Sequence, residues 1–167
     1  VVDPNVIKSH CPEHVANDEK ASKEWLDNQL QTNQKNLKDL LIKSANTISD
    51  AFTSMPPGII TEAQLIYRKV YERYGDFASQ ILGGFLFLRF LLPPFTLTSL
   101  VGLPPVIDNA PRKTLVETCK ILNSAVNKGT VDDKPEYQYL AETAETVLYP
   151  TLNGFFKKIL KADTKNK

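Results

Sequence analysis

Apolar residues recur at helical spacing along most of this 167-residue chain, and this periodicity constrains the fold more than any other feature. Leu30, Leu37, Leu41, Ile48 and Phe52 follow one another at steps of four and seven residues. Such steps place them on one face of an amphipathic helix. Every long segment has this period and none alternates as a strand does, so we expect an all-α protein built as an irregular helical bundle.

Prolines and glycines divide the helical pattern into segments. Residues 1–18 carry two prolines, both histidines and scattered charges, so we expect an irregular lead-in there. The Asn- and Gln-rich stretch 28–36 is a weak helix former, at which the first long helix could divide. Residues 162–167 are expected to form a flexible tail.

The next helices are marked by their ends. Thr61 and Gln64 have the spacing of a capping box, and Gly75 stands where a helix C-terminus favours glycine. The stretch from 77 to 92 is apolar on nearly all sides and should therefore be central. Pro111 marks the start of a further helix, which we expect to end near Gly129. The spacing of its apolar residues predicts a buried face of Leu115, Cys119, Leu122 and Val126. A helical pattern then resumes and continues to about residue 161.

Charge and cysteine content exclude several classes of protein. The chain has 20 Lys and Arg against 19 Asp and Glu, a net charge of +1, which argues against a nucleic-acid binder that neutralises the phosphate backbone. Two cysteines cannot make a disulfide framework or a four-thiolate zinc site, so free thiols and a cytoplasmic location are the simpler interpretation.

The two ends of the sequence and its most apolar segment allow further predictions. The chain begins without Met and without a signal segment, so we expect a piece of a longer protein. Residues 81–92 are apolar apart from Arg89, but a bilayer span needs about 20 apolar residues, so we interpret the run as a buried helix. The lysine-rich end, 157–167, either faces an acidic membrane or simply suits a helix C-terminus.

Chemistry-bearing motifs are scarce. His10, Cys11 and His14 are metal ligands by type, but no fourth ligand follows at a sensible spacing, so we expect no metal site. Gly-x-Ser-x-Gly, a glycine-rich phosphate loop and His-Glu-x-x-His are all absent from the sequence. With both histidines among the first 14 residues, a Ser-His or Cys-His catalytic pair is improbable.

Arg89 is the most informative residue. It stands among phenylalanines and leucines from 85 to 92, although a guanidinium cannot lose its proton and an unpaired buried charge is very unfavourable. Its donors must therefore reach carboxylates or carbonyl oxygens, or its stem must extend to solvent. The functional alternative is that Arg89 crosses to an irregular loop and holds the carbonyls of that loop.

A polar stripe follows on the helix that Pro111 opens. Lys120, Asn123 and Asn127 are spaced at i, i+3 and i+7, opposite the predicted apolar face. A solvated face is the ordinary explanation of such a stripe. Asparagine is a poor helix former, however, and two on one stripe favour placed hydrogen-bonding groups.

At these residues the chain resembles the catalytic domain of Ras GTPase-activating proteins, the RasGAP family, and in particular its neurofibromin-like members. The resemblance rests on Gly84–Phe90 with Pro93, which is similar to the Phe-Leu-Arg motif of the family, and on Arg112–Asn127, which is similar to the helix that follows. Segments 2–4, 33–37 and 56–57 fit as well. The resemblance spans nearly the whole chain and implies a partial domain, the C-terminal portion over residues 1–167.

The resemblance also implies roles for single residues. Arg89 would brace the loop that carries the arginine finger, through main-chain carbonyls, without touching the nucleotide. The groove for the GTPase would be formed by Leu88, Pro93, Lys120, Asn123 and Asn127. The finger loop lies upstream in the family, near a Phe-Arg-x-Asn-like segment, and this sequence has none, so no catalytic residue is expected in the chain.

The sequence departs from the family at three positions. Leu92 stands where the family usually has Asn, Pro94 where it has Ala, and Asn123 where Gln is common. Loss of the Asn side chain at Leu92 would remove a polar contact near the surface that meets the GTPase switch regions, which puts full activating ability in doubt.

Three functions remain open at this point. In the first, the chain is part of a regulatory domain, not an enzyme, that binds a GTP-bound Ras-type small GTPase and stimulates its hydrolysis. It would need no cofactor, because GTP and Mg²⁺ belong to the GTPase, and it would meet a membrane only through that partner. The second is a non-catalytic IQGAP-like scaffold for GTP-loaded GTPases, and the third is a helical module without a GTPase partner.

Overall fold

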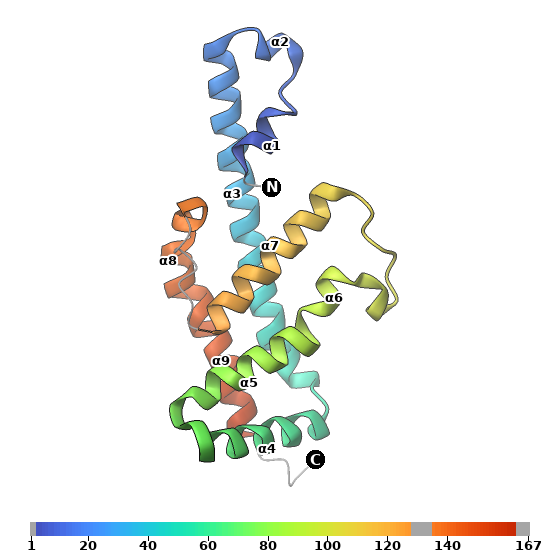
Figure 1. Ribbon diagram of the computed structural model, residues 1–167, viewed down its shortest axis with the longest axis vertical. Helices are drawn as coiled ribbons and strands as arrows, with labels where there is room; N and C mark the ends of the chain where they lie inside the picture. The colour runs from blue at the N-terminus through green and yellow to red at the C-terminus, as the bar shows by residue number, and fades with distance from the viewer. Residues whose placement is uncertain (1–2, 128–134, 163–167) are drawn as a thin grey trace.

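The computed structural model describes residues 3–127 and 135–162, and the regular structure within these two ranges is entirely helical. The all-α expectation is thereby confirmed. Its axis is α3 (Glu19–Asp50), a 32-residue helix that runs through the length of the molecule (Figure 1). The short helices α1 and α2 pack against its first half, and α7 and α9 pack against its second half (Figure 1).

The first helices show why the lead-in is more regular than expected. The structure has α1 (Pro4–Lys8) and α2 (Glu13–Ala16) where the sequence suggested irregular chain. Asp3 caps α1, since its carboxylate accepts a hydrogen bond from the Asn5 amide at 2.9 Å, and Pro4 suits the first helical position. Ile7 is buried, so this first turn is also held by packing. The expected tail lies outside the described residues from 163 onward.

The helix α3 is continuous, so the expected division at the Asn- and Gln-rich stretch is wrong. Asp18 caps its start by accepting hydrogen bonds from the amides of Lys20 and Ala21 at 2.9 and 3.1 Å. The predicted stripe is confirmed at Leu37 and Leu41, both buried, as is Ile48 further on. Packing of this face outweighs the weak helix propensity of the preceding amide residues.

The remaining elements follow in chain order. They are η1 (Ala51–Ser54), α4 (Pro57–Tyr74), η2 (Gly75–Phe77), α5 (Ala78–Leu86), the π-helical turn η3 (Phe87–Leu91), α6 (Pro93–Thr96), η4 (Thr98–Val101), α7 (Asn109–Val126), η6 (Pro135–Leu140), α8 (Ala141–Thr143), the π-helical turn η7 (Ala144–Leu148) and α9 (Tyr149–Lys161). The short helices α6 and η4 therefore follow η3 before α7 begins at Asn109. The expected end at Gly129 lies outside the described residues.

The predicted capping box at Thr61 and Gln64 is wrong. The helix begins four residues earlier, at Pro57, and the Thr61 hydroxyl donates to the Pro57 carbonyl at 3.0 Å. The Gln64 amide instead donates to the carbonyls of Ile159 and Ala162, each at 2.8 Å. Gln64 thus satisfies carbonyls at the C-terminal end of α9, a partner 95 residues away that local spacing cannot reveal.

The core lies where α3, α5, α7 and α9 meet. Phe87 and Phe155 are fully buried, and Phe156 packs against both, with ring centroids 5.7 and 5.5 Å away. The predicted buried face of α7 is confirmed at Cys119, Leu122 and Val126, which all belong to this core. Leu115 is only partly buried.

Gly83 lets α5 approach α7 and α9 closely. A Cβ at this position would lie 2.6 Å from Cγ1 of Val126 and 3.5 Å from Cζ of Phe156. We expect Gly83→Ala to lower the free energy of unfolding by about 1–3 kcal/mol, because the added methyl forces a packed side chain to move. Gly154→Ala in α9, where a Cβ meets nothing within 4 Å, should instead raise it by about 0.5–1 kcal/mol. Urea unfolding of both variants measures the two changes.

Within residues 3–127 and 135–162, one helical stretch, Pro57–Thr96, is long and apolar enough to cross a membrane by length and composition. A core helix of a soluble protein passes the same test, and Leu82, Leu86 and Phe87 of this stretch do pack into the core. The length and composition of this stretch are therefore not evidence that the chain spans a membrane.

Candidate functional site

Arg89 lies on the surface of the described part of the chain, in the π-helical turn η3. Its side chain is exposed, and among the described residues it has no hydrogen-bond or ion-pair partner. Its neighbours Leu88 and Phe90 are 54% and 58% exposed, whereas Phe87 is fully buried. The helix does reach the core through Leu82, Leu86 and Phe87, but the expectation that residues 81–92 are buried on nearly all sides is wrong. The helix buries one side only, and Arg89 stands on the other side in an exposed apolar surface.

Asn127 faces α5, and Asn123 is joined to it by a hydrogen bond. Both are half-buried, and the Asn127 amide donates to the Asn123 side-chain oxygen at 3.3 Å. Oδ1 of Asn127 lies 3.3 Å from the place of a Cβ on Gly84, one residue before Phe85 of the Phe-Leu-Arg helix. Gln80 of the same helix donates to the Asn127 backbone carbonyl at 3.2 Å. The two asparagines are thus placed hydrogen-bonding groups at the junction of α5 and α7.

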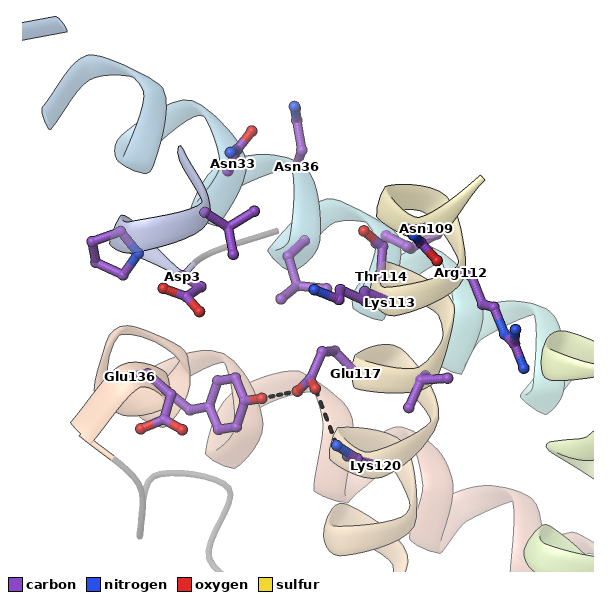
Figure 2. A pocket seen from close by; sticks show the side chains of 16 residues that line it. Asp3, Asn33, Asn36, Asn109, Arg112, Lys113, Thr114, Glu117, Lys120 and Glu136 are labelled. Carbon is purple, nitrogen blue, oxygen red and sulfur yellow. Dashed lines mark hydrogen bonds and ion pairs between the residues drawn. The ribbon is translucent and has the colours of Figure 1, made fainter. Parts of the chain in front are cut away.

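Lys120 begins the stripe but contacts a different group. Its ammonium donates to Glu117 Oε1 at 3.1 Å, and both residues line a pocket of about 980 Å³ between α1, α3, α7 and η6. Figure 2 shows Glu117 beside Lys120. The Tyr137 hydroxyl donates to the other carboxylate oxygen, Glu117 Oε2. The structure therefore brings Asn123 and Asn127 together, while the head group of Lys120 is held by the carboxylate one turn before it.

This pocket was not foreseen from the sequence. Charged groups of both signs surround it, with Asp3 and Glu136 on one side and Lys113 on the helix opposite (Figure 2). The residues come from four segments far apart in the chain, so no local spacing links them. Among the described residues, no group of three or more His, Cys, Asp and Glu side chains could hold a metal ion.

Leu92 and Pro93 lead from η3 into α6. Pro93 opens α6, which packs against α7 and is half-buried at this residue. Leu92 belongs to the core, and its carbonyl accepts a hydrogen bond from Cys119 Sγ at 3.8 Å. The Leu92 side chain is therefore part of the core and is not itself exposed at a contact surface.

Burial of Cys119 has a chemical consequence. Desolvation raises the pKa of its thiol from the ordinary 9.0 to about 11, because the buried thiolate is disfavoured. The folded state therefore holds the thiol proton more tightly, and this contribution to stability is present below pH 9 and is lost as the pH rises toward 11.

We expect the two thiols to differ in reactivity. At pH 8, iodoacetamide should modify Cys119 at least about tenfold more slowly than Cys11, which is partly exposed, because the thiolate is the reacting species. Peptide mass spectrometry after timed labelling measures both rates in one sample. Equal rates would show that the contact between α6 and α7 opens readily in solution.

A family comparison covers most of these features. Residues 3–127 match the RasGAP family, described as GTPase-activator protein for Ras-like GTPase. No curated protein gives a significant match to the chain. The matched region runs from α1 to the end of α7 and so contains η3, the asparagine pair and Lys120. With most of its length matched, the chain belongs to the RasGAP family, and this membership implies a GTPase-activating role toward Ras-like GTPases in signal transduction.

Proposed function

We propose that this chain forms the GTPase-binding part of a RasGAP domain and that the arginine finger is supplied by a segment outside this sequence. The observation that carries the proposal is the close approach of Asn127 to α5: its Oδ1 lies 3.3 Å from the position of a Cβ on Gly84, and its carbonyl accepts a hydrogen bond from Gln80. It joins the polar stripe of α7 to α5, the helix that continues into η3 with Leu88 and Arg89. The assignment to the C-terminal, neurofibromin-like portion of the domain belongs to this proposal.

In this proposal the residues of the expected groove act on the GTP-bound partner. Leu88 and Pro93 offer apolar contact, and Lys120, Asn123 and Asn127 offer donors to its switch regions. Arg89 has five donors in a rigid fork, well suited to backbone carbonyls, and its exposure leaves them available to a finger loop. The chain is regulatory and not itself an enzyme. GTP and Mg²⁺ belong to the GTPase, and the chain acts in the cytoplasm, meeting membranes only through its partner.

The chemistry explains why the chain alone should stimulate little. Phosphoryl transfer is catalysed mainly by placing charge near the developing transition state, and an arginine finger in Ras-type systems is known to be worth on the order of 10³–10⁵ in rate. That range is a general value for such proteins and does not come from this structure. Without a finger, binding of the GTPase is the activity that the chain retains.

Single-turnover GTP hydrolysis tests this division of roles. A Ras-type GTPase loaded with GTP is mixed with this chain, and separately with a protein that contains both this chain and a finger-bearing segment. We expect little acceleration in the first reaction and strong acceleration in the second. Strong acceleration by the chain alone would contradict the missing finger. Pull-down with GTP-loaded and GDP-loaded GTPase, expected to retain the GTP form, tests whether a GTPase is the partner at all.

One observation keeps the IQGAP-like scaffold as a second candidate. Leu92 is a core residue at a position where the family usually has Asn, so a polar group of the usual groove is replaced by packing. A scaffold predicts that the finger-containing protein slows or leaves unchanged the hydrolysis by its GTPase. The same single-turnover measurement therefore distinguishes an activator from a scaffold.

Charge reversal at Lys120 should weaken GTPase binding. We expect Lys120→Glu to raise the Kd by roughly tenfold at low ionic strength and less at high salt, because screening weakens an exposed charge contact. Lys69→Glu is the matched control, since Lys69 also pairs with a glutamate three residues away, at 3.1 Å, but on α4. Asn127→Ala should weaken binding with little salt dependence. Titration at two salt concentrations measures all three, and an equal loss for Lys69→Glu would contradict a specific role of Lys120.

A further inference from the structure

Glu117 is the residue that most directly controls Lys120. Its Oε1 accepts from the Lys120 ammonium at 3.1 Å, and its Oε2 accepts from the Tyr137 hydroxyl. The Glu117 side chain is only 31% exposed, against 61% for Lys120. The carboxylate is therefore the more restrained half of the ion pair and determines where the ammonium lies.

Tyr137 makes this arrangement different from an ordinary surface ion pair. Its ring is buried in the core, so its hydroxyl is a fixed donor, and it comes from η6, beyond the segment 3–127 that matches the family. The other ion pair among the described residues, Lys69 with Glu72, is exposed on both sides, and both carboxylate oxygens face the lysine. An exposed pair of that kind contributes little because both side chains move freely, whereas the anchored Glu117 holds its partner in place.

The ion pair changes the electrostatic attraction between Lys120 and an approaching protein. At distances well beyond 3.1 Å, the opposite charges of Lys120 and Glu117 nearly cancel. An acidic surface is therefore attracted less than it would be by a lone lysine, and an acid that approaches Lys120 closely also meets the fixed Glu117 carboxylate. A surface that brings a hydrogen-bond donor or a base for Glu117 together with an acid for Lys120 avoids that repulsion.

We infer that Glu117, anchored by Tyr137, is a specificity-determining residue of the GTPase-binding surface. In the free protein it neutralises the charge of Lys120. It favours GTPases whose surface presents an acidic group beside a hydrogen-bond donor or a basic group, and it disfavours GTPases whose surface presents acidic groups alone. This inference rests on the proposed GTPase binding. It assigns η6, outside the matched segment, a part in choosing the partner.

Removing the charge at Glu117 while keeping its shape is the direct test. Glu117→Gln should raise the association rate with a GTP-loaded Ras-type GTPase roughly three- to tenfold at low ionic strength, and the rate should then fall more steeply with salt. Glu136→Gln is the matched control, because Glu136 lines the same pocket and also loses one negative charge, while its side chain is exposed. In a Lys120→Gln background, Glu117→Gln should raise the rate no more than Glu136→Gln does, because only the general loss of one negative charge remains.

A second measurement needs no GTPase. The ¹⁵Nζ order parameter of Lys120 should fall in both Glu117→Gln and Tyr137→Phe, while that of Lys69 stays unchanged. A Lys120 ammonium already fully mobile in the unaltered chain would overturn the inference. Equal gains in association rate from Glu117→Gln and Glu136→Gln would overturn it too, leaving GTPase binding intact. If no variant binds a GTP-loaded GTPase, the proposed function and the specificity role both fail.

Discussion

Replacing Phe87 by alanine is expected to lower the free energy of unfolding by about 3–5 kcal/mol, which is the usual loss for a fully buried phenylalanine. Phe87 is 0% exposed, and its ring packs against Phe156 of α9 with centroids 5.7 Å apart. Truncation leaves a cavity between η3 and α9 that surrounding helices cannot close without moving. Urea or thermal unfolding followed by circular dichroism at 222 nm measures the loss.

Phe90→Ala is the control for this experiment. Phe90 lies three residues later in the same turn, is 58% exposed and touches the ring of Phe85 edge-on at 5.6 Å. Its truncation should change the free energy of unfolding by less than about 1 kcal/mol, since little buried area is lost. Similar losses for the two variants would mean that this segment buries both rings and that the exposed apolar surface around Arg89 does not exist in solution.

Arg89→Ala should reduce stimulation of GTP hydrolysis by on the order of 10²-fold in a protein that contains both this chain and the finger-bearing segment. The expected loss corresponds to misplacement of a catalytic group whose supporting contacts are gone. Stability should change by less than about 0.5 kcal/mol, because Arg89 is exposed and has no partner among the residues that the structure describes. Single-turnover hydrolysis at saturating protein gives the rate, and a titration gives the affinity.

Arg89→Lys separates charge from geometry at this position. Lysine keeps the positive charge but loses the planar fork that can hold two carbonyls at once, so we expect most of the activity to remain lost. The affinity for the GTPase should change much less than the rate in both variants. A collapse of affinity with an unchanged rate at saturation would place Arg89 at the GTPase contact and would contradict its role as a brace.

Features that depend on one helix were predictable from the sequence. The apolar stripe of α3 at Leu37, Leu41 and Ile48 and the face of α7 at Cys119, Leu122 and Val126 are buried as their spacing predicts. A period of 3.6 residues encodes which side of a helix is apolar, and burial of that side follows from the hydrophobic effect alone. The interpretation of Asn123 and Asn127 as placed groups had a sequence signal too, since asparagine is a poor helix former.

Features that depend on contacts between distant segments were not predictable. Gln64 has the spacing of a local cap, yet its amide reaches carbonyls at the end of α9. The stretch 77–92 is apolar on nearly all sides, so its sequence contains no sign of which side faces the core. The π-helical turn at Phe87–Leu91 and the packing of Phe87 on Phe156 decide that Leu88, Arg89 and Phe90 face outward.

The amino-acid sequence by itself determined the helical class, the apolar faces of the long helices and the kinship with RasGAP domains, because these depend on residue types at short, regular intervals. Only the tertiary structure decided the exposure of Arg89, the burial of Leu92 and the pairing of Lys120 with Glu117 under Tyr137. The physical reason is that a helix can turn any of its faces toward a neighbour. The choice is made by how well side chains from separate parts of the chain fit and pair, and periodicity along one helix does not specify that fit.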